Sequence, residues 1–466
     1  MIAGPDRGRR ALAGALVLSL VGAGVRAEAY DPSTTLTGVA QRAAEAVELH
    51  KILFDRFGLP LGQFEPLVLG PREEALFGAQ LELLDPADGL LPERGRLPAL
   101  SWLLAGAVLE STPAARVRHH FFEPKSGKGL DDRRLGARLW LAIAGGRELG
   151  GAFDLTGRPA PEWAVAKDNE LGLPAFLAAL EAAAAEPTPV ARAGALARAL
   201  LCAGALSALV ADMASPSHVR NDFRVGHLEP LSDTPFDRGS RYETWVARAY
   251  GRLGVPAATP IRLSRLADHF KQLAEAVQRG FLSPGTLPPG VPVGARTTAQ
   301  AVEARLAETT PLGGPAPRGL HFGAGYVAGE VVSILARVTQ TEGRLELSLD
   351  DRVHAAYAQV LLPMAVRHAS GALAMLLRGT VRISREGVVS VEGGQLLRAR
   401  VRILAEDGKG ERRQLWGLED RSAAAGGRLC EIDLAQLPAG TRRVIVVGRG
   451  VDDAGEPMVA SGQLTL

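Results

Sequence analysis

Two residues in the middle of the chain could share a metal ion. A long apolar stretch from about Val190 delivers Asp212 near its end, and Pro216 forces the chain out of the helix before His218. A carboxylate and an imidazole held by a rigid helix and a fixed turn are the preorganised donors that a metal site needs. The alternative is that Asp212 is a helix-terminal carboxylate and His218 part of a structural turn network, and the residues alone leave both open.

Three further side chains could add donors. His120 follows another histidine, Glu243 lies two residues before a tryptophan, and His227 lies between the apolar stretch and Glu243. Imidazole and carboxylate are the side chains that bind Zn²⁺ in hydrolytic sites, where the metal activates water. A solvated histidine pair, a glutamate at the start of a helix and an ordinary polar histidine are the competing interpretations.

The segment 208–218 resembles the hallmark of the zinc-dependent phospholipase C family and its relatives, the single-strand-specific zinc nucleases. In that family a helix ends in H-x-x-x-D and is followed by a proline and by a histidine six residues after the aspartate. Asp212, Pro216 and His218 match this motif, whereas Ala208 occupies the position of the first histidine. The resemblance implies a mainly helical domain and metal-dependent hydrolysis of phosphodiesters.

Other segments extend the resemblance over most of residues 30–378. The segment 118–124 is similar to the one in which the family carries a zinc-binding histidine, and His120 fits that role. The preceding acidic pair of the family is changed here, because Ser111 stands in place of its aspartate. Leu36 replaces another zinc-binding histidine.

The remaining metal positions of the family are only partly matched. Signal cleavage after Ala29 leaves Tyr30 as the N-terminal aromatic residue whose amino group and carbonyl bind zinc in the family. Glu243 resembles the last acidic ligand, but Gly239 stands where its partner histidine belongs, so His227 is the nearest substitute.

Three zinc ions surround the phosphate in the family, and the substitutions remove ligands from two of these positions. The resemblance therefore implies zero to two zinc ions in place of three. The candidate metal ligands are His120, Asp212, His218, His227 and Glu243. We expect weak or no hydrolase activity on phospholipid or another phosphodiester. The alternative is a metal-poor pseudoenzyme that binds a lipid, glycan or protein partner.

The elements that position these residues begin with a predicted signal peptide over residues 1–29. A basic start with three arginines precedes an apolar run from Ala11 to Val25, and Ala27 and Ala29 form an A-x-A cleavage site. This pattern predicts a secreted or periplasmic protein. The apolar run is too short for a convincing membrane span.

Helical periodicity dominates between Val39 and Leu376, and strand patterns are nearly absent there. The periodicity thus predicts a mainly α helical bundle over residues 30–378, and the family resemblance implies that this bundle is phospholipase C-like. After Gly379, β-branched residues alternate between glycine-rich turns, which predicts a small β-sandwich over residues 379–466, an independent module that can be deleted. The predicted helices are 36–57, 98–111, 130–147, 172–185, 189–213, 240–253, 263–280, 323–339 and 350–378.

Composition excludes several classes of protein. The 466 residues are 47% hydrophobic and 22% charged, which is typical of globular chains long enough for two or three domains. A formal net charge of +2 gives no global attraction to nucleic acid or anionic membranes. The two cysteines, Cys202 and Cys430, do not form the disulfide framework of a small secreted domain, and we expect Cys202 to be a buried hydrophobe.

Overall fold

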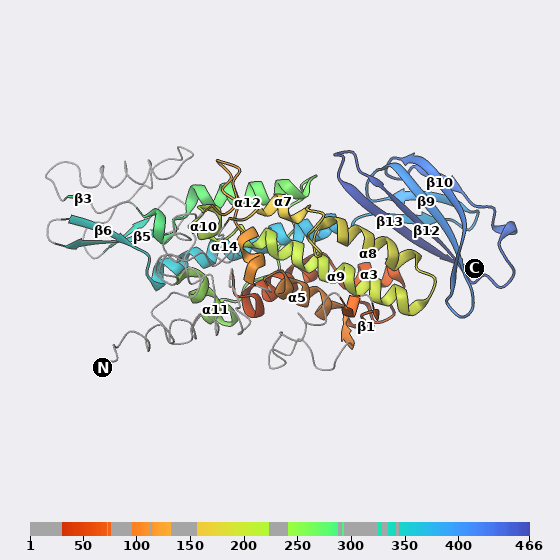
Figure 1. Cartoon of the computed structure of the whole chain (residues 1–466), viewed down its shortest axis with the longest axis horizontal. Helices are drawn as coiled ribbons and strands as arrows, with labels where there is room; N and C mark the ends of the chain where they lie inside the picture. The colour runs from red at the N-terminus through yellow and green to blue at the C-terminus, as the bar shows by residue number, and fades with distance from the viewer. Residues whose placement is uncertain are drawn as a thin grey trace, which may run out of the picture.

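The computed structural model describes residues 30–71, 73–75, 96–111, 114–131, 156–222, 241–287, 291–292, 325–328, 334–341 and 344–466. The predicted signal peptide, His227 and nearly all of the predicted helix 130–147 lie outside these residues. Helices form the middle of the molecule, the C-terminal strands lie at one end, and a small sheet lies at the other (Figure 1). The chain thus has an N-terminal helical domain and a C-terminal β domain.

Most of the predicted helices are confirmed with ends shifted by at most three residues. The longer helices are α2 (Thr37–Ala46), α3 (Leu49–Phe57), α5 (Ala99–Glu110), α8 (Leu173–Ala185), α9 (Pro189–Asp212), α11 (Arg241–Leu253), α12 (Leu266–Gly280) and α14 (Asp351–Leu376). Two short helices, α7 (Ala160–Ala164) and α10 (Pro216–Val219), lie near the candidate site. The predicted helix 36–57 is two helices, because Glu48 adopts a left-handed conformation with φ 55° between α2 and α3.

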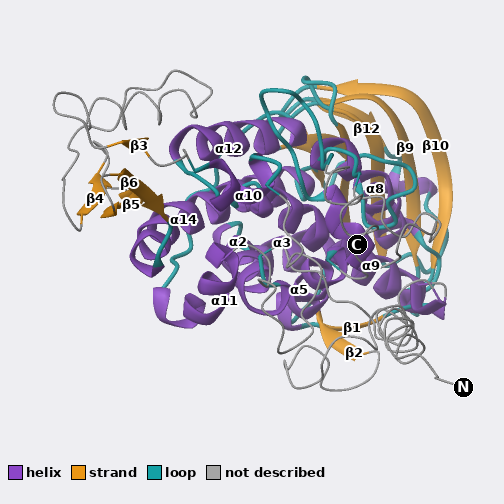
Figure 2. Ribbon diagram, turned by 60° about the vertical axis from the view of Figure 1, so that its left-hand side comes forward, coloured by secondary structure: helices purple, strands orange, loops and turns teal. Residues whose placement is uncertain are grey.

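Helix α9 is the centre of the helical domain. It packs against α5, α8 and α14, and Figure 2 shows it between α5 and α8. Its N-cap is Thr188, whose hydroxyl accepts a hydrogen bond from the Ala191 amide. By length and composition α9 could cross a membrane, but 89% of its most apolar window is buried inside the protein. Cys202, which is free and fully buried, lies on this core helix.

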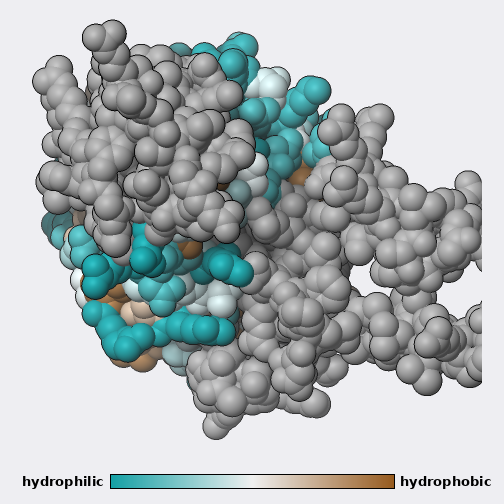
Figure 3. Space-filling model, turned by 90° about the vertical axis from the view of Figure 1, so that its left-hand side faces the viewer, coloured by the Kyte–Doolittle hydropathy of each residue, from teal (hydrophilic) through white to brown (hydrophobic). Residues whose placement is uncertain are grey.

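The predicted helix 323–339 is wrong. This region contains strands β4 (Gly325–Ala328) and β5 (Ile334–Thr341), which join β6 (Arg344–Ser348) and β3 (Val291–Pro292) in an antiparallel sheet of order β3-β6-β5-β4. The segment is rich in β-branched residues and begins with two glycines, a composition that favours strands over a helix. Seen from the end of the molecule that carries this sheet, the described surface is mostly hydrophilic (Figure 3).

The C-terminal domain consists of seven strands around a core of its own. They are β7 (Thr380–Ile383), β8 (Val388–Glu392), β9 (Leu396–Glu406), β10 (Arg412–Ala423), β11 (Arg428–Glu431), β12 (Arg443–Val451) and β13 (Pro457–Thr465), in the order β10-β9-β12-β13-β7-β8-β11. Strands β13 and β7 are joined at one residue pair, Ser461 with Thr380. This junction divides the strands into two groups, β10-β9-β12-β13 and β7-β8-β11. Buried side chains from the two groups meet in one apolar cluster, so the sheet encloses a core as a sandwich does.

Candidate functional site

The end of α9 and the turn after it position the central residues of the candidate site. Asp212 is the last residue of α9, and Pro216 occupies the first turn of α10, which carries His218. The backbone amide of Phe122 donates to the carbonyl of His218, which fixes this turn against the segment that follows His120. Asp212, His218 and His120 are fully buried, and Glu243 at the start of α11 is 2% exposed.

His120 and Asp212 form a hydrogen-bonded pair. Nδ1 of His120 lies 2.7 Å from Oδ2 of Asp212, and Nε2 lies 3.3 Å from the carbonyl oxygen of Glu110. Burial lowers the pKa of His120 to about 4 and, with a contribution from the nearby Glu243 carboxylate, raises the pKa of Asp212 to about 8. Both shifts favour the uncharged forms of the two side chains.

His218 and Glu243 form a second pair. Nε2 of His218 lies 3.5 Å from Oε1 of Glu243, and the ring of His218 stacks on Phe121 with a centroid distance of 4.5 Å. The hydroxyl of Ser217 donates to the same carboxylate oxygen at 2.8 Å, and that of Ser215 donates to it as well. Glu243 is thus held by two serines of the turn that carries His218.

The replaced ligand positions also lie in the interior. Leu36 and Ala208 are 1% and 2% exposed, and Ala208 lies one helical turn before Asp212 on α9. Ser111 caps α5 and is buried. The hydroxyl of Tyr30 lies 3.1 Å from the carbonyl of Ala214 and 3.1 Å from the hydroxyl of Tyr242. Tyr30 is thus packed beside the turn between Asp212 and His218.

The donors of the described residues do not fit the zinc cluster that the sequence resemblance implies. Two ligands on one tetrahedral zinc lie about 3.4 Å apart, which matches His218 and Glu243. A direct hydrogen bond of 2.7 Å, however, leaves no space for an ion between the bonded atoms of His120 and Asp212. Among the described residues, no three His, Cys, Asp or Glu side chains are grouped to hold a metal. The site residues therefore form two neighbouring pairs, with the ring centroids of His120 and His218 6.4 Å apart.

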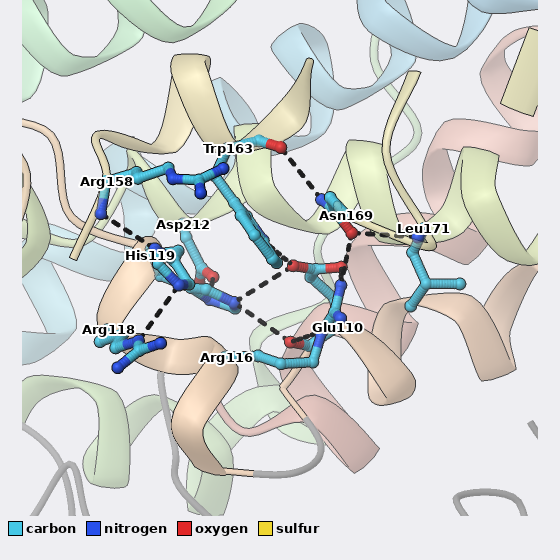
Figure 4. A network of polar contacts seen from close by, with 10 residues as sticks. Glu110, Arg116, Arg118, His119, Arg158, Trp163, Asn169, Leu171 and Asp212 are labelled. Atoms are coloured by element: carbon cyan, nitrogen blue, oxygen red, sulfur yellow. Dashed lines mark hydrogen bonds and ion pairs between the residues drawn. The ribbon is translucent and has the colours of Figure 1, made fainter. Parts of the chain in front are cut away.

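A polar network that the sequence did not predict surrounds Glu110 (Figure 4). The backbone carbonyl oxygen of Glu110 is the one that Nε2 of His120 contacts. The fully buried carboxylate of Glu110 accepts hydrogen bonds from Nη2 of Arg116 at 2.6 Å and from Nε1 of Trp163 at 2.7 Å. Arg116 also donates to Oδ1 of Asn169 at 2.7 Å. Glu110 precedes Ser111 in a segment that carries the family resemblance. The partners of its carboxylate, Arg116 and Trp163, come from other segments, and no local sequence pattern connects them with Glu110.

An open pocket lies beside Trp163. It has a volume of about 450 Å³ and is lined by Arg118, His119, Thr156, Gly157, Arg158, Trp163 and Asp168. His119 stacks on Trp163 with centroids 4.2 Å apart and rings tilted by 15°. Nδ1 of His119 accepts from the Arg158 amide at 2.9 Å, and Arg158 is paired with Asp168. His119 therefore lines the pocket, whereas its neighbour His120 faces Asp212 in the interior.

Comparisons with known proteins give only a distant likeness. No protein-family model matches the chain, and no curated protein matches it. A solved structure of the alpha toxin from Clostridium absonum is 9% identical, with a TM-score of 0.30, and covers 94% of this chain and 99% of that one. The alpha-toxin of Clostridium perfringens from avian strain SWCP is 10% identical, with a TM-score of 0.31, and covers 93% of this chain and 98% of that one. Similarity at this level assigns no activity to the chain.

Proposed function

We propose that this protein is an exported, phospholipase C-like protein that binds a phosphate-bearing ligand without hydrolysing it. The observation that carries the proposal is the geometry of the two buried pairs. His120 is bonded to Asp212, and Glu243 accepts from two serines, so these donors interact with their own chain. A catalytic centre must also reach its substrate, and these four side chains are at most 2% exposed.

The pocket beside Trp163 supplies the ligand site of this proposal. The guanidinium groups of Arg118 and Arg158 line it, and only Asp168 contributes a carboxylate to its wall. Guanidinium groups recognise phosphate oxygens through paired, charge-assisted hydrogen bonds. The face of Trp163 is covered by His119 and by the guanidinium of Arg116, 5.2 Å from the ring centroid, which makes this wall rigid. A phosphate group fits the excess of positive charge.

Metal content and turnover test the absence of hydrolysis. Purified mature protein is incubated with Zn²⁺, dialysed, and assayed with phosphatidylcholine and with a chromogenic phosphodiester. We expect less than one tightly bound zinc per chain and no turnover above that of a buffer control. Stoichiometric zinc together with turnover that Asp212→Asn abolishes would establish the competing function, a metal-dependent phosphodiesterase.

Titration with inorganic phosphate tests the binding site. We expect saturable binding that Arg118→Gln weakens about tenfold, because one charge-assisted hydrogen bond contributes roughly 1.5 to 3 kcal/mol. Arg382→Gln is the matched control, since its side chain is 73% exposed on β7 of the other domain. Equal phosphate affinity in the wild type and in Arg118→Gln would remove the pocket from the proposal.

A further inference from the structure

A second cavity, of about 310 Å³, lies between the helical domain and the β domain. Arg56 of α3 and Arg192 of α9 contribute to its wall from the helical side, and Arg412 of β10 and Arg443 of β12 from the other side. Glu406, near the end of β9, is the one carboxylate among the residues that line it. The cavity is thus bordered by four guanidinium groups and one acidic group.

Three of these arginines share the same carboxylate. Oε2 of Glu406 accepts from Nε of Arg412 at 2.8 Å and from Nη2 of Arg192 at 3.5 Å, while Oε1 accepts from Arg443 at 3.1 Å. Glu406 is 4% exposed. One negative charge therefore faces three positive charges, and the carboxylate itself is largely closed to water.

Arg56 adds a charge that no described carboxylate neutralises. Arg56 is 6% exposed. Its guanidinium donates to Ser461 Oγ and to the carbonyl oxygens of Leu377, Arg378 and Val459. These acceptors satisfy its hydrogen bonds but carry no formal charge. Burying an ion without a counter-ion costs several kcal/mol. An anion in the adjoining cavity would compensate for that cost.

The cavity wall also holds free donors and an apolar part. Among the hydrogen bonds described, Arg443 uses one of its five N–H donors and Arg412 uses two. Phe57, Leu59, Leu67, Leu196 and Ile445 supply apolar surface to the same cavity. Its volume is at the lower end of the range of small-molecule sites.

We propose that the cavity between the two domains binds a small amphiphilic anion, whose carboxylate or phosphate head meets Arg412 and Arg443 and whose short apolar tail lies against Leu67 and Ile445. This site is separate from the Trp163 pocket and does not depend on the proposed function. Because residues from both domains line the cavity, the ligand also bridges the two domains.

Calorimetric titration of the full chain tests the proposal with n-hexanoate and n-hexyl phosphate, which distinguish the two head groups. We expect saturable binding of one ligand per chain for at least one of them, and none for the cation hexyltrimethylammonium. Arg443→Gln should weaken binding at least about tenfold. This side chain is 43% exposed, so the variant is expected to fold. Arg382→Gln, on the surface of the same domain, should bind like the wild type.

A variant that fills the cavity tests whether binding needs the space that the apolar tail occupies. Ala193 borders the cavity on α9, and Ala193→Leu should weaken the binding of both hexyl probes, with a thermal unfolding midpoint that confirms folding. Failure of both probes to bind, or equal binding in wild type and Arg443→Gln, would overturn the proposal. Arg118→Gln should leave n-hexanoate binding unchanged while it weakens the binding of inorganic phosphate at the Trp163 pocket, so failure of this site and failure of the Trp163 pocket are distinguishable.

Discussion

At the scale of single residues, the buried carboxylate of Glu110 organises the interior next to the candidate site. Arg116 neutralises it, and Trp163 donates to its other oxygen. The ring of Trp163 in turn stacks on His119. Glu110 therefore connects the wall of the open pocket with the backbone carbonyl that His120 contacts.

Arg116→Ala should destabilise the protein by about 3 kcal/mol, because it leaves the buried Glu110 carboxylate without its counter-ion. The measurement is urea unfolding at neutral pH, followed by circular dichroism. Arg118→Ala is the matched control: its side chain is exposed, and we expect a change within about 0.5 kcal/mol. Equal effects of the two substitutions would show that Glu110 does not need Arg116.

The residues of the candidate site were predictable from the sequence to the extent that a motif fixes them. Asp212 and His218 lie together because a helix and a proline turn connect them, and His120 and Glu243 join them in the structure. Their role as metal ligands stays a prediction. The network around Glu110 was not predictable. Trp163, which donates to Glu110, and Asn169, which accepts from Arg116, each lie 53 residues from the residue that they bond and carry no recognisable pattern.

At the scale of elements, helices α5 and α9 approach each other through two glycines. A Cβ atom on Gly106 would lie 1.9 Å from the carbonyl oxygen of Leu201, and one on Gly204 would lie 1.8 Å from that of Leu103. Both obstacles are backbone atoms, which cannot move without shifting a helix. The contact between α5 and α9 that positions Glu110 and Asp212 therefore depends on these two glycines.

Gly204→Ala should destabilise the protein by roughly 2 kcal/mol, because the added methyl group forces α5 and α9 apart. In a helix without such a contact the same change stabilises by up to about 1 kcal/mol, since alanine has the higher helix propensity. Gly251→Ala on α11, where a Cβ meets no atom within 4 Å, is the control for that gain. Thermal unfolding of both variants gives the comparison, and a stabilised Gly204→Ala protein would contradict the close packing.

The elements show why some of the fold was predictable and some was not. Helices α8, α9 and α14 have long alanine- and leucine-rich stretches with recognisable ends, such as Thr188 and Asp350 at their N-caps. The segment 323–339 contains alanines beside β-branched residues. Its strands are stabilised by tertiary contacts, because β4 pairs with β5 and β5 pairs with β6. Periodicity within one segment does not report such pairing.

At the scale of the whole molecule, buried histidines make stability depend on pH. Burial lowers the pKa of His269 and of His354 to about 4, and that of His368 to about 3. The unfolded chain binds protons at these residues below about pH 6.5, whereas the folded chain resists them. Their contribution is therefore complete above pH 6.5 and is lost as the pH falls toward 4.

Each of these histidines should reduce the free energy of unfolding by roughly 1 to 2 kcal/mol between pH 7 and pH 5. Urea unfolding at the two pH values measures the loss. His354→Gln should unfold with a smaller pH dependence than the wild type, whereas substitution of the exposed His50 by glutamine should leave the dependence unchanged. An identical pH dependence in all three proteins would mean that His354 is accessible to protons in the folded state.

The sequence predicts that the β domain can be deleted without loss of folding in the helical domain. The contacts at the junction of the two domains lead to the opposite expectation. Leu404, Ile445, Val447 and Val459 of the β domain belong to the apolar core of the helical domain. Ion pairs add to this contact, because the carboxylate of Glu181 on α8 meets Arg400, Arg402 and Arg449.

A fragment of residues 30–379 should therefore aggregate or unfold. Removing the β domain exposes the apolar side of α8 and α9, leaves Glu181 without its three arginines, and deprives Arg56 of two acceptors, Val459 and Ser461. Burying about 100 Å² of apolar surface contributes roughly 2.5 kcal/mol, so loss of four core side chains is comparable to the stability of a whole domain. Size-exclusion chromatography and thermal unfolding test the fragment beside the full chain. A monomeric fragment that unfolds cooperatively, with a thermal midpoint near that of the full chain, would show that the helical domain folds without the β domain. In that case Glu181→Gln in the full chain should have little effect on stability.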